Sequence, residues 1–325
     1  MSSSSLALVG VGNAIVDVIA TVDESFIIQH GLTKGVMTLV DAERADALYA
    51  AMPPAVEVSG GSAANTMVGL ASFGAASSYI GKVRDDQLGA VFSHDITAAG
   101  VRFAVPPAPE GAATARCLIQ VTPDAERTMN TYLGISSVLA PDDVDADLVA
   151  QADIVYCEGY LWDTELAKAA IRKAMTVGRE HGAVVSMTLS DGFCVDRHRG
   201  EWLDLLTDQV DLVFANEEEV CSLFESDDVE RAMDKLASLC QMVVVTRGAK
   251  GSRISTDGIV VDVPAVPVEH LVDTTGAGDL YAAGFLYGLA NGMTPERCGT
   301  LGSAAASEVI SHMGARPHIS LATLL

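Results

Sequence analysis

The stretch VDTTGAGDLYAAGF, residues 272–285, places two glycines, an alanine and an aspartate directly before a run of small and apolar residues. This run predicts a helix that begins near the second glycine. The first backbone amides of a helix have no partner within it, and the helix dipole favours an anion there. We therefore expect the amides of Gly276, Ala277 and Gly278 to form an anion hole, because small side chains let a phosphate approach the backbone.

Asp279 follows this loop directly and has two interpretations. A carboxylate in the first turn of a helix can act simply as a cap. However, a carboxylate beside a bound phosphate is electrostatically costly unless it takes part in the chemistry. A base that accepts a hydroxyl proton during in-line phosphoryl transfer accounts for both the loop and the carboxylate. This hypothesis makes Asp279 the catalytic residue.

The composition restricts the class of ligand. The chain has 325 residues, a formal net charge of -23, and 49% hydrophobic but only 19% charged residues. Nucleic acids and anionic membranes need basic patches on their partners, so we expect neither. If the ligand is rich in phosphate, backbone amides, a few cations or a metal must offset the negative field of the protein.

The chain is also expected to be a soluble, cytoplasmic protein. No apolar run reaches the length of a membrane-spanning helix. Residues 1–20 are unlike a secretory signal, because they lack a basic start and Asp17 interrupts their apolar run.

Apolar runs and helical patterns alternate through most of the sequence. Residues 153–161, 183–189 and 210–216 read as buried strands, and 164–181 reads as a helix between the first two. This βαβα order predicts a mostly parallel sheet covered by helices, an α/β fold. Residues 14–22 and 113–133 instead alternate in polarity, with a turn signal at 122–126, and predict antiparallel hairpins in a small attached sheet.

Two common nucleotide-binding motifs are absent from the sequence. The segment VGVGN, residues 9–13, has Ile15 where a dinucleotide-binding fingerprint needs its third glycine, and a strand pattern continues where a helix should begin. No G-x-x-x-x-G-K-[ST] motif occurs either, so phosphates must be bound by another device.

A second glycine pair precedes a helical pattern at VSGGSAANTMVGLASFG, residues 58–74. Small residues there serve either helix–sheet packing or close approach of the backbone to a ligand, with Asn65 facing it. Two further segments, NEEE at 216–219 and TRGAKG at 246–251, follow predicted strands. NEEE can be a solvated acidic helix start, but the carboxyl ends of strands are where open α/β sheets bind ligands.

The ordered set GNAIVDV (12–18), GGSAANT (60–66), NEEE, TRGAKG and DTTGAGD (273–279) resembles the PfkB family, the group of ribokinases and adenosine kinases. The resemblance covers nearly the whole chain. It implies one ribokinase-like domain over 1–325, with a mostly parallel central sheet flanked by helices. It also implies a small β-sheet lid, formed by insertions at about 14–40 and 101–135.

The resemblance further implies ATP as phosphoryl donor, Mg²⁺ bridging its phosphates, and the roles of individual residues. Asp279 would be the catalytic base, and Arg127 the lid arginine that contacts the transferring phosphate, although a solvated arginine beside a turn is an equal alternative. The residues implied to bind the acceptor are Asn13, Asp17, Gly60, Gly61 and Asn65. Those implied at the ATP site are Asn216, Thr246, Arg247, Gly248 and Gly251, with Glu219 acting on the metal through water.

The identity of the acceptor has two alternatives. The N-terminal half and the segment ERTMNTYLG are most similar to adenosine kinases, and Leu133 could form an apolar wall for a purine. Thr275, however, stands where adenosine kinases commonly have asparagine, which favours a sugar kinase of the ribokinase or fructokinase type. A non-catalytic nucleotide sensor is a third hypothesis. A monomer or a homodimer and a monovalent-cation requirement are all compatible with the sequence.

Overall fold

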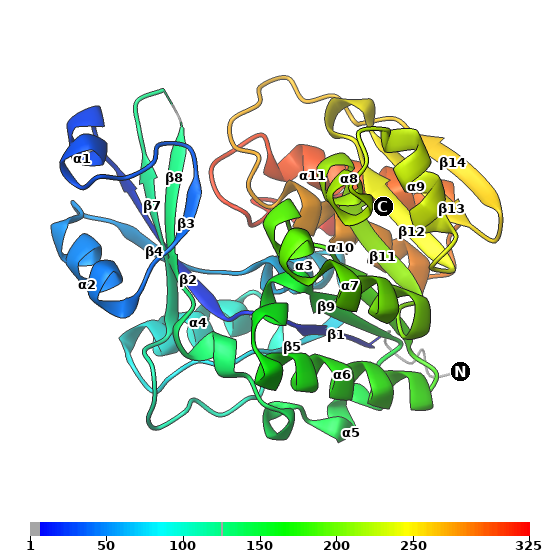
Figure 1. Cartoon of the computed structure of the whole chain (residues 1–325), viewed down its shortest axis with the longest axis horizontal. Helices are drawn as coiled ribbons and strands as arrows, with labels where there is room; N and C mark the ends of the chain where they lie inside the picture. Colours follow the sequence, from blue (N-terminus) through cyan, green and yellow to red (C-terminus); the bar gives the residue numbers. More distant parts are fainter. Residues whose placement is uncertain (1–6, 125) are drawn as a thin grey trace.

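The computed structural model describes residues 7–124 and 126–325, which form an α/β body and a smaller sheet at its side (Figure 1). The body contains a nine-stranded sheet in the order β14-β13-β12-β11-β10-β9-β1-β5-β6. Its strands from β12 to β6 are all parallel, whereas β13 and β14 are antiparallel additions at one edge. The bounds are β1 Ala7–Val11, β5 Ala76–Ile80, β6 Arg102–Phe103, β9 Ile154–Glu158, β10 Val184–Thr188, β11 Leu212–Asn216, β12 Met242–Thr246, β13 Ser252–Thr256 and β14 Ile259–Val263.

Helices cover both faces of this sheet, and successive strand residues supply the two cores. Val155 and Cys157 belong to one core and Ile154 and Tyr156 to the other, as the alternation of side chains along a strand requires. The first core packs under α5 Ala146–Val149, α6 Glu165–Glu180, α7 Gly192–Asp208, α8 Glu217–Phe224 and α9 Val229–Ala237. The second packs under α3 Ser62–Phe73, α4 Gln87–Ala98, α10 Ala277–Ala290 and α11 Pro295–Val309. The predicted parallel sheet flanked by helices is thus confirmed.

The smaller sheet has five strands in the order β3-β8-β7-β2-β4. Its strands are β2 Ile15–Thr21, β3 Met37–Leu39, β4 Val56–Gly60, β7 Ala115–Val121 and β8 Arg127–Tyr132, and it carries α1 Glu24–Gln29 and α2 Ala42–Ala51. Single 3-10 turns lie elsewhere, at η1 Gly134–Val138, η2 Pro141–Asp143, η3 Gly159–Asp163, η4 Gly248–Lys250 and η5 Leu321–Leu324.

The pairing in the small sheet differs in part from the sequence-based expectation. Strands β7 and β8 form the expected antiparallel hairpin, although residue 125 in its turn lies outside the described residues. Strand β2 instead pairs in parallel with β7 and antiparallel with β4, whose residues fall outside the two expected insertions. Strand β6, within the expected second insertion, belongs to the large sheet. Alternation of polarity along a sequence indicates which face of a strand is buried, but it does not indicate which strands pair with it. The expected and observed pairings of β2 differ for this reason.

The two faces of the small sheet have different surroundings. Val16, Val18 and Leu118 point to the side covered by α2 and its buried Leu48. Ile15, Asp17 and Ile119 have the opposite parity and line a cavity against the body. The sheet therefore places an apolar wall containing one carboxylate over the carboxyl ends of the body strands. Within the described residues, none of the helices has both the length and the apolarity needed to span a membrane.

Candidate active site

A cavity of about 970 Å³ is lined by both sheets. The small sheet contributes apolar side chains, the carboxyl ends of the body strands contribute polar ones, and the loop before α10 completes the lining. Of the residues expected at the site, the lining contains Asn13, Asp17, Gly61, Asn65, Leu133, Asn216, Glu219, Thr246 and Gly276 to Asp279. It does not contain Gly60, Arg127, Arg247, Gly248 or Gly251.

Asp279 lies in the first turn of α10 and is held by two side chains of α3. Ser62 Oγ donates to Asp279 Oδ1 over 2.6 Å, and Asn65 Nδ2 donates to Oδ2 over 3.0 Å. Burial raises the pKa of Asp279 to about 6, against the opposing effect of these two hydrogen bonds and of the Arg316 guanidinium. The carboxylate therefore has the pKa of a base that functions near neutral pH.

The backbone before Asp279 presents free amides, as expected, with one difference. Gly276 is the N-cap of α10 and has φ 77°, and a Cβ there would lie 2.8 Å from Ala315. The amide of Ala277 donates to the Thr274 carbonyl over 3.2 Å, so a turn already uses it. Within the described residues, the amides of Gly276 and Gly278 have no acceptor. Of the three amides expected to bind an anion, those of Gly276 and Gly278 are available for this role, whereas that of Ala277 closes the loop.

The glycine pair before α3 lets the backbone and Asp17 come close together. Gly61 has φ 97°, and a Cβ on it would lie 2.4 Å from the Asn13 carbonyl oxygen. A Cβ on Gly60 would lie 2.4 Å from Asp17 Oδ2. The absence of a side chain on Gly60 therefore leaves room for the Asp17 carboxylate, whereas Gly61 lines the cavity itself. Burial raises the pKa of Asp17 to about 6, although Arg127 and Arg316 oppose this effect.

Glu158, at the end of β9, is a site residue that the sequence analysis missed. Its side chain is 1% exposed and accepts hydrogen bonds from the amides of Asn13 and Ala63, each over 2.8 Å, and from Asn13 Nδ2 over 2.9 Å. Burial raises its pKa to about 7. Glu158 thus joins the loop after β1 to the start of α3. Its signal in the sequence is a charged residue that closes an otherwise apolar strand.

Arg127 is neither solvated nor on the cavity wall. Its guanidinium donates to the carboxylate of Asp273, and the two side chains are 10% and 3% exposed. Asp273 belongs to the loop before α10, so the pair joins the small sheet to that loop. The interpretation of Arg127 as a surface arginine is therefore wrong. In order to contact a phosphate, the guanidinium would have to break its hydrogen bond to Asp273, or donate to Asp273 and the phosphate at the same time.

The segments that end β11 and β12 differ in what they offer the cavity. Asn216 and Glu219 form a capping box at the start of α8, with Asn216 Nδ2 donating to Glu219 Oε1 over 2.6 Å. Both line the cavity, as does Thr246. Arg247 instead pairs with Glu217 and Glu230, over 2.9 and 3.0 Å.

Gly248 and Gly251 belong to a tight turn outside the cavity wall. A Cβ on Gly251 would lie 2.0 Å from the Val263 carbonyl oxygen. Together with Arg247, these two glycines have structural contacts here, because they shape the connection from β12 to β13.

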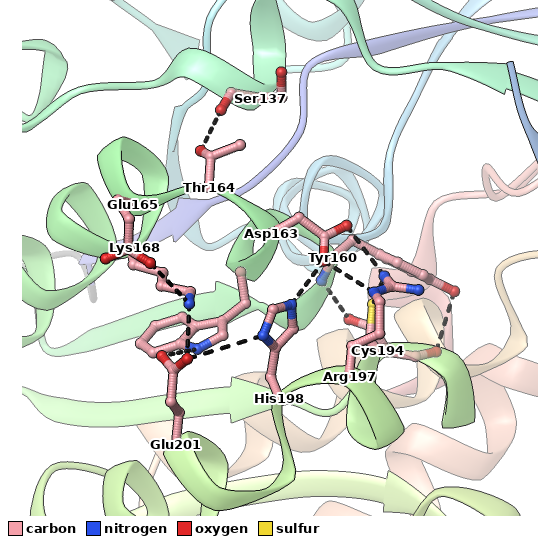
Figure 2. Close-up of polar contacts among 12 residues, drawn as sticks. Ser137, Tyr160, Asp163, Thr164, Glu165, Lys168, Cys194, Arg197, His198 and Glu201 are labelled. Atoms are coloured by element: carbon pink, nitrogen blue, oxygen red, sulfur yellow. Dashed lines mark hydrogen bonds and ion pairs between the residues drawn. The ribbon is translucent and has the colours of Figure 1, made fainter. Parts of the chain in front are cut away.

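The part of the wall formed by η3 and the start of α7 carries a charged network (Figure 2). The Asp163 carboxylate accepts hydrogen bonds from Nε and Nη2 of Arg197, each over 3.1 Å. It also forms a hydrogen bond with Nε2 of His198 over 2.8 Å. Tyr160 lines the cavity beside this pair, as does Phe193, which is 70% exposed. Behind them, Glu201 accepts from the Lys168 ammonium over 2.8 Å. Two aromatic rings and a fixed guanidinium therefore face the same cavity.

The charges around the cavity are strongly unbalanced. Among the described residues, its lining contains a single cationic side chain, Arg197, which is already paired with Asp163. Seven carboxylates line it: Asp17, Glu158, Asp163, Asp191, Glu218, Glu219 and Asp279. A polyphosphate bound here must be neutralised by the free amides, by an arginine that moves, or by a cation that arrives with it.

The α/β body with its small sheet, and a carboxylate beside free helix-start amides in the cavity that they share, define a kinase of the ribokinase-like fold. Residues 31–321 match the model of the pfkB family carbohydrate kinases, and the chain belongs to this family. Among curated relatives, adenosine kinase 1 of Arabidopsis thaliana is 28% identical over 94% of both chains. A probable fructokinase-6 of the same plant is 30% identical over 72% of this chain and 63% of its own.

Two solved structures are similar over almost the whole chain. A probable sugar kinase protein from Rhizobium etli CFN 42 has a TM-score of 0.93 and 48% identity, covering 98% of this chain and 97% of its own. An adenosine kinase from Sinorhizobium meliloti has a TM-score of 0.92 and 50% identity, covering 99% and 98%. The relatives thus include kinases described for nucleosides and kinases described for sugars.

Proposed function

We propose that this kinase transfers the γ-phosphate of ATP to the primary hydroxyl of adenosine. The observation that carries the proposal is that a base-like carboxylate, two free amides and an apolar wall meet in one cavity. Ile15, Leu39, Ile119, Met129 and Leu133 of the small-sheet side contribute apolar surface. A free sugar has little apolar surface to bury against this wall. A purine can bury its ring there, and each Å² of apolar surface removed from water stabilises the complex by roughly 25 cal/mol.

The polar groups around Asp279 suit the ribose end of such a nucleoside. Asp17 and Asn65 line the cavity near Asp279 and offer acceptors and donors to the secondary hydroxyls of the ribose. Tyr160 and Phe193 offer aromatic faces for the base. Asp279 accepts the proton of the primary hydroxyl as that oxygen attacks, and the amides of Gly276 and Gly278 hold the migrating phosphoryl group.

Magnesium fits the donors at the β11 end of the cavity. Glu218 and Glu219 after β11 and Asp191 after the neighbouring β10 line the cavity close to one another. No group of three or more potential ligands converges on one point in the part of the chain that is described. Burial raises the pKa of Glu219 to about 7, because it disfavours the ionised carboxylate. A nearby cation would stabilise the ionised form and lower this pKa. This set suits Mg²⁺, which keeps most of its water shell and binds few carboxylates. When bound, the ion would supply charge neutralisation to the phosphates.

The second candidate is a sugar kinase of the ribokinase or fructokinase type, favoured by Thr275 in the loop. The similarity to a structure described as a probable sugar kinase supports it as well. A non-catalytic sensor is less well supported, because a sensor needs no base and Asp279 has the environment of one.

An acceptor panel separates the candidates. Turnover of MgATP is measured with adenosine, other nucleosides, ribose and fructose at matched concentrations, and kcat/KM is compared. We expect adenosine to give the highest value. A clear preference for a free pentose or hexose would overturn the nucleoside proposal and leave the kinase class intact. No turnover with any acceptor would favour the sensor. Chelation of the divalent cation should abolish turnover, and Mg²⁺ should restore it.

A further inference from the structure

The segment after α11 brings a buried arginine to the rear of the catalytic carboxylate. Arg316 Nε donates to Asn65 Oδ1 over 3.0 Å, and Asn65 Nδ2 donates to Asp279 Oδ2 over 3.0 Å. The three residues come from the C-terminal segment, α3 and α10, so the fold and not the local sequence assembles this chain. Arg316 does not line the cavity, and its Nη2 atom is buried without a partner among the described residues.

The chemistry of the two outer groups fixes the orientation of the Asn65 amide. A guanidinium has only donors and a carboxylate has only acceptors. With Oδ1 toward Arg316 and Nδ2 toward Asp279, both contacts are hydrogen bonds. Rotating the amide by half a turn would oppose two donors at one end and two acceptors at the other. Arg316 therefore makes one orientation of Asn65 strongly preferred, and in that orientation Asn65 donates to the base.

The charge of Arg316 acts on the same carboxylate. The charged and titratable groups around Asp279 come from several elements: Asp17 of β2, Tyr156 and Glu158 of β9, Tyr160 of η3, and Arg316. Arg316 itself also faces Asp95 of α4 and Tyr79 of β5, and Arg127 and Asp273 face Asp17. Arg316 is the one cation among the described residues that lowers the pKa of Asp279, and its effect is smaller than those of burial and of the hydrogen bonds from Ser62 and Asn65. It works against a burial that favours the protonated, inactive form.

We propose that Arg316 is a positioning residue for phosphoryl transfer: it orients Asn65 so that this amide holds Asp279 in place, and it supplies a buried positive charge behind that carboxylate. This inference rests on the role proposed for Asp279 as the base. Arg316 contacts neither substrate, so its removal should act on the rate and its pH dependence more than on binding.

The test compares Arg316→Met with the wild type, using whichever acceptor the wild type phosphorylates best. We expect kcat to fall by about tenfold or more, with a smaller change in the KM for ATP. The acidic limb of kcat/KM should move to higher pH by about one unit, because a cation near the carboxylate is lost. Arg316→Lys should return the limb toward its wild-type position. Arg316→Gln, which can donate to Asn65 but carries no charge, should leave it displaced.

A mutant cycle tests the path through Asn65. If Arg316 acts by orienting this amide, Arg316→Met should lower kcat much less in an Asn65→Ala background than in the wild type. Equal effects in both backgrounds would overturn the positioning role. Arg116→Met is the matched control, since Arg116 of β7 is also a buried arginine, is paired with Asp46 of α2, and does not line the cavity. It should lower the melting temperature without moving the pH limb.

The outcomes distinguish this inference from the proposed function. An Arg316→Met variant that melts early but keeps the wild-type kcat and pH limb would make Arg316 purely structural. If that variant does not fold, the Lys and Gln variants decide, because equal pH limbs in the two would overturn the charge effect. An Asp279→Asn variant with normal turnover would instead remove the base on which the inference depends. Loss of activity in Asp279→Asn with no effect of Arg316 would overturn the inference alone.

Discussion

The guanidinium of Arg127, on strand β8 of the small sheet, donates to the carboxylate of Asp273, the first residue of the DTTGAGD loop. Asp273 also accepts from the amide and hydroxyl of Thr275, over 3.0 and 2.7 Å, and from the amide of Gly314 over 2.9 Å. Burial alone would raise the pKa of Asp273, but these donors and Arg127 hold it below its usual value. The small sheet is therefore tied electrostatically to the loop that carries the free amides.

Arg127→Ala should lower both stability and turnover. Removal of a charged donor from a buried carboxylate lowers the free energy of unfolding by about 2 kcal/mol. The loss should not be larger, because Asp273 still accepts three hydrogen bonds from Thr275 and Gly314. If the arginine also reaches the transferring phosphate, kcat should fall by about 10² or more. Thermal unfolding and single-acceptor kinetics on the same variant measure the two effects.

The control for Arg127 is Arg116→Ala, which removes a buried arginine from the adjacent strand β7. This variant should lose stability but keep kcat within about threefold, because Arg116 pairs with Asp46 and not with the loop before α10. If Arg127→Ala also keeps its kcat, Arg127 serves only as a structural link between the sheet and the loop.

The sequence predicted the body of the fold well and the contacts between distant segments poorly. Strand β9 is apolar on both faces until Glu158 ends it, and α6 has a regular apolar stripe, so the local sequence pattern predicts both elements. The pairing of β2 with β4 and β7 could not be predicted from the alternation of polar and apolar residues, because that pattern does not depend on which strand lies beside it. Likewise Asp279 stood out beside glycines, but Arg316 reaches it only through the tertiary fold, and nothing near residue 316 in the sequence indicates that contact.

Leu39→Ala should weaken binding of a nucleoside acceptor. Leu39, on the edge strand β3, is 48% exposed and lines the cavity. Losing part of its contact with a purine removes about 1 kcal/mol, which is about a fivefold rise in KM for adenosine. The KM for ATP should remain unchanged if the small sheet contacts the acceptor.

Ile28→Ala is the matched control for Leu39. Ile28 lies on α1, is 79% exposed and does not line the cavity, so its truncation should leave both KM values unchanged. An unchanged KM for adenosine in the Leu39 variant would count against an acceptor that packs on the small sheet. It would then favour the smaller sugar acceptors of the second candidate function.

Gly61→Ala should disrupt the acceptor site as well as the fold. The residue has φ 97°, and its new Cβ would lie 2.4 Å from the Asn13 carbonyl oxygen, which is backbone and cannot turn away. Gly74→Ala is the control, because Gly74 has φ 95° but open space around the Cβ position. Both variants should pay about 1–2 kcal/mol for the left-handed conformation. Only the Gly61 variant should lose more than this and raise the KM for the acceptor, as denaturant unfolding and kinetics can measure.

Asp279→Asn should remove activity without removing the fold. The carboxylate accepts from Ser62 and Asn65 and caps no amide of α10 through its side chain, so a loss of helix capping is not expected. Loss of general-base assistance should lower kcat by at least about 10². The affinity for MgATP should stay the same or improve, because a carboxylate no longer repels the phosphate. The exposed N-cap variant Asp228→Asn should show neither effect.

The pH dependence gives Asp279 a second, independent signature. Its pKa in the folded protein is about 6, above the usual 3.8, so kcat/KM should fall as the pH drops below about 6. Asp17 has a similarly raised pKa and interacts with Asp279, so the acidic limb belongs to the pair. A raised carboxyl pKa stabilises the folded state fully below the unfolded value, and that stability is lost as the pH rises through the folded value. Between pH 5 and 7.5 the melting temperature of Asp279→Asn should therefore rise relative to the wild type. A variant that keeps wild-type turnover, or whose melting temperature falls relative to the wild type across this range, would show that Asp279 is an ordinary structural carboxylate.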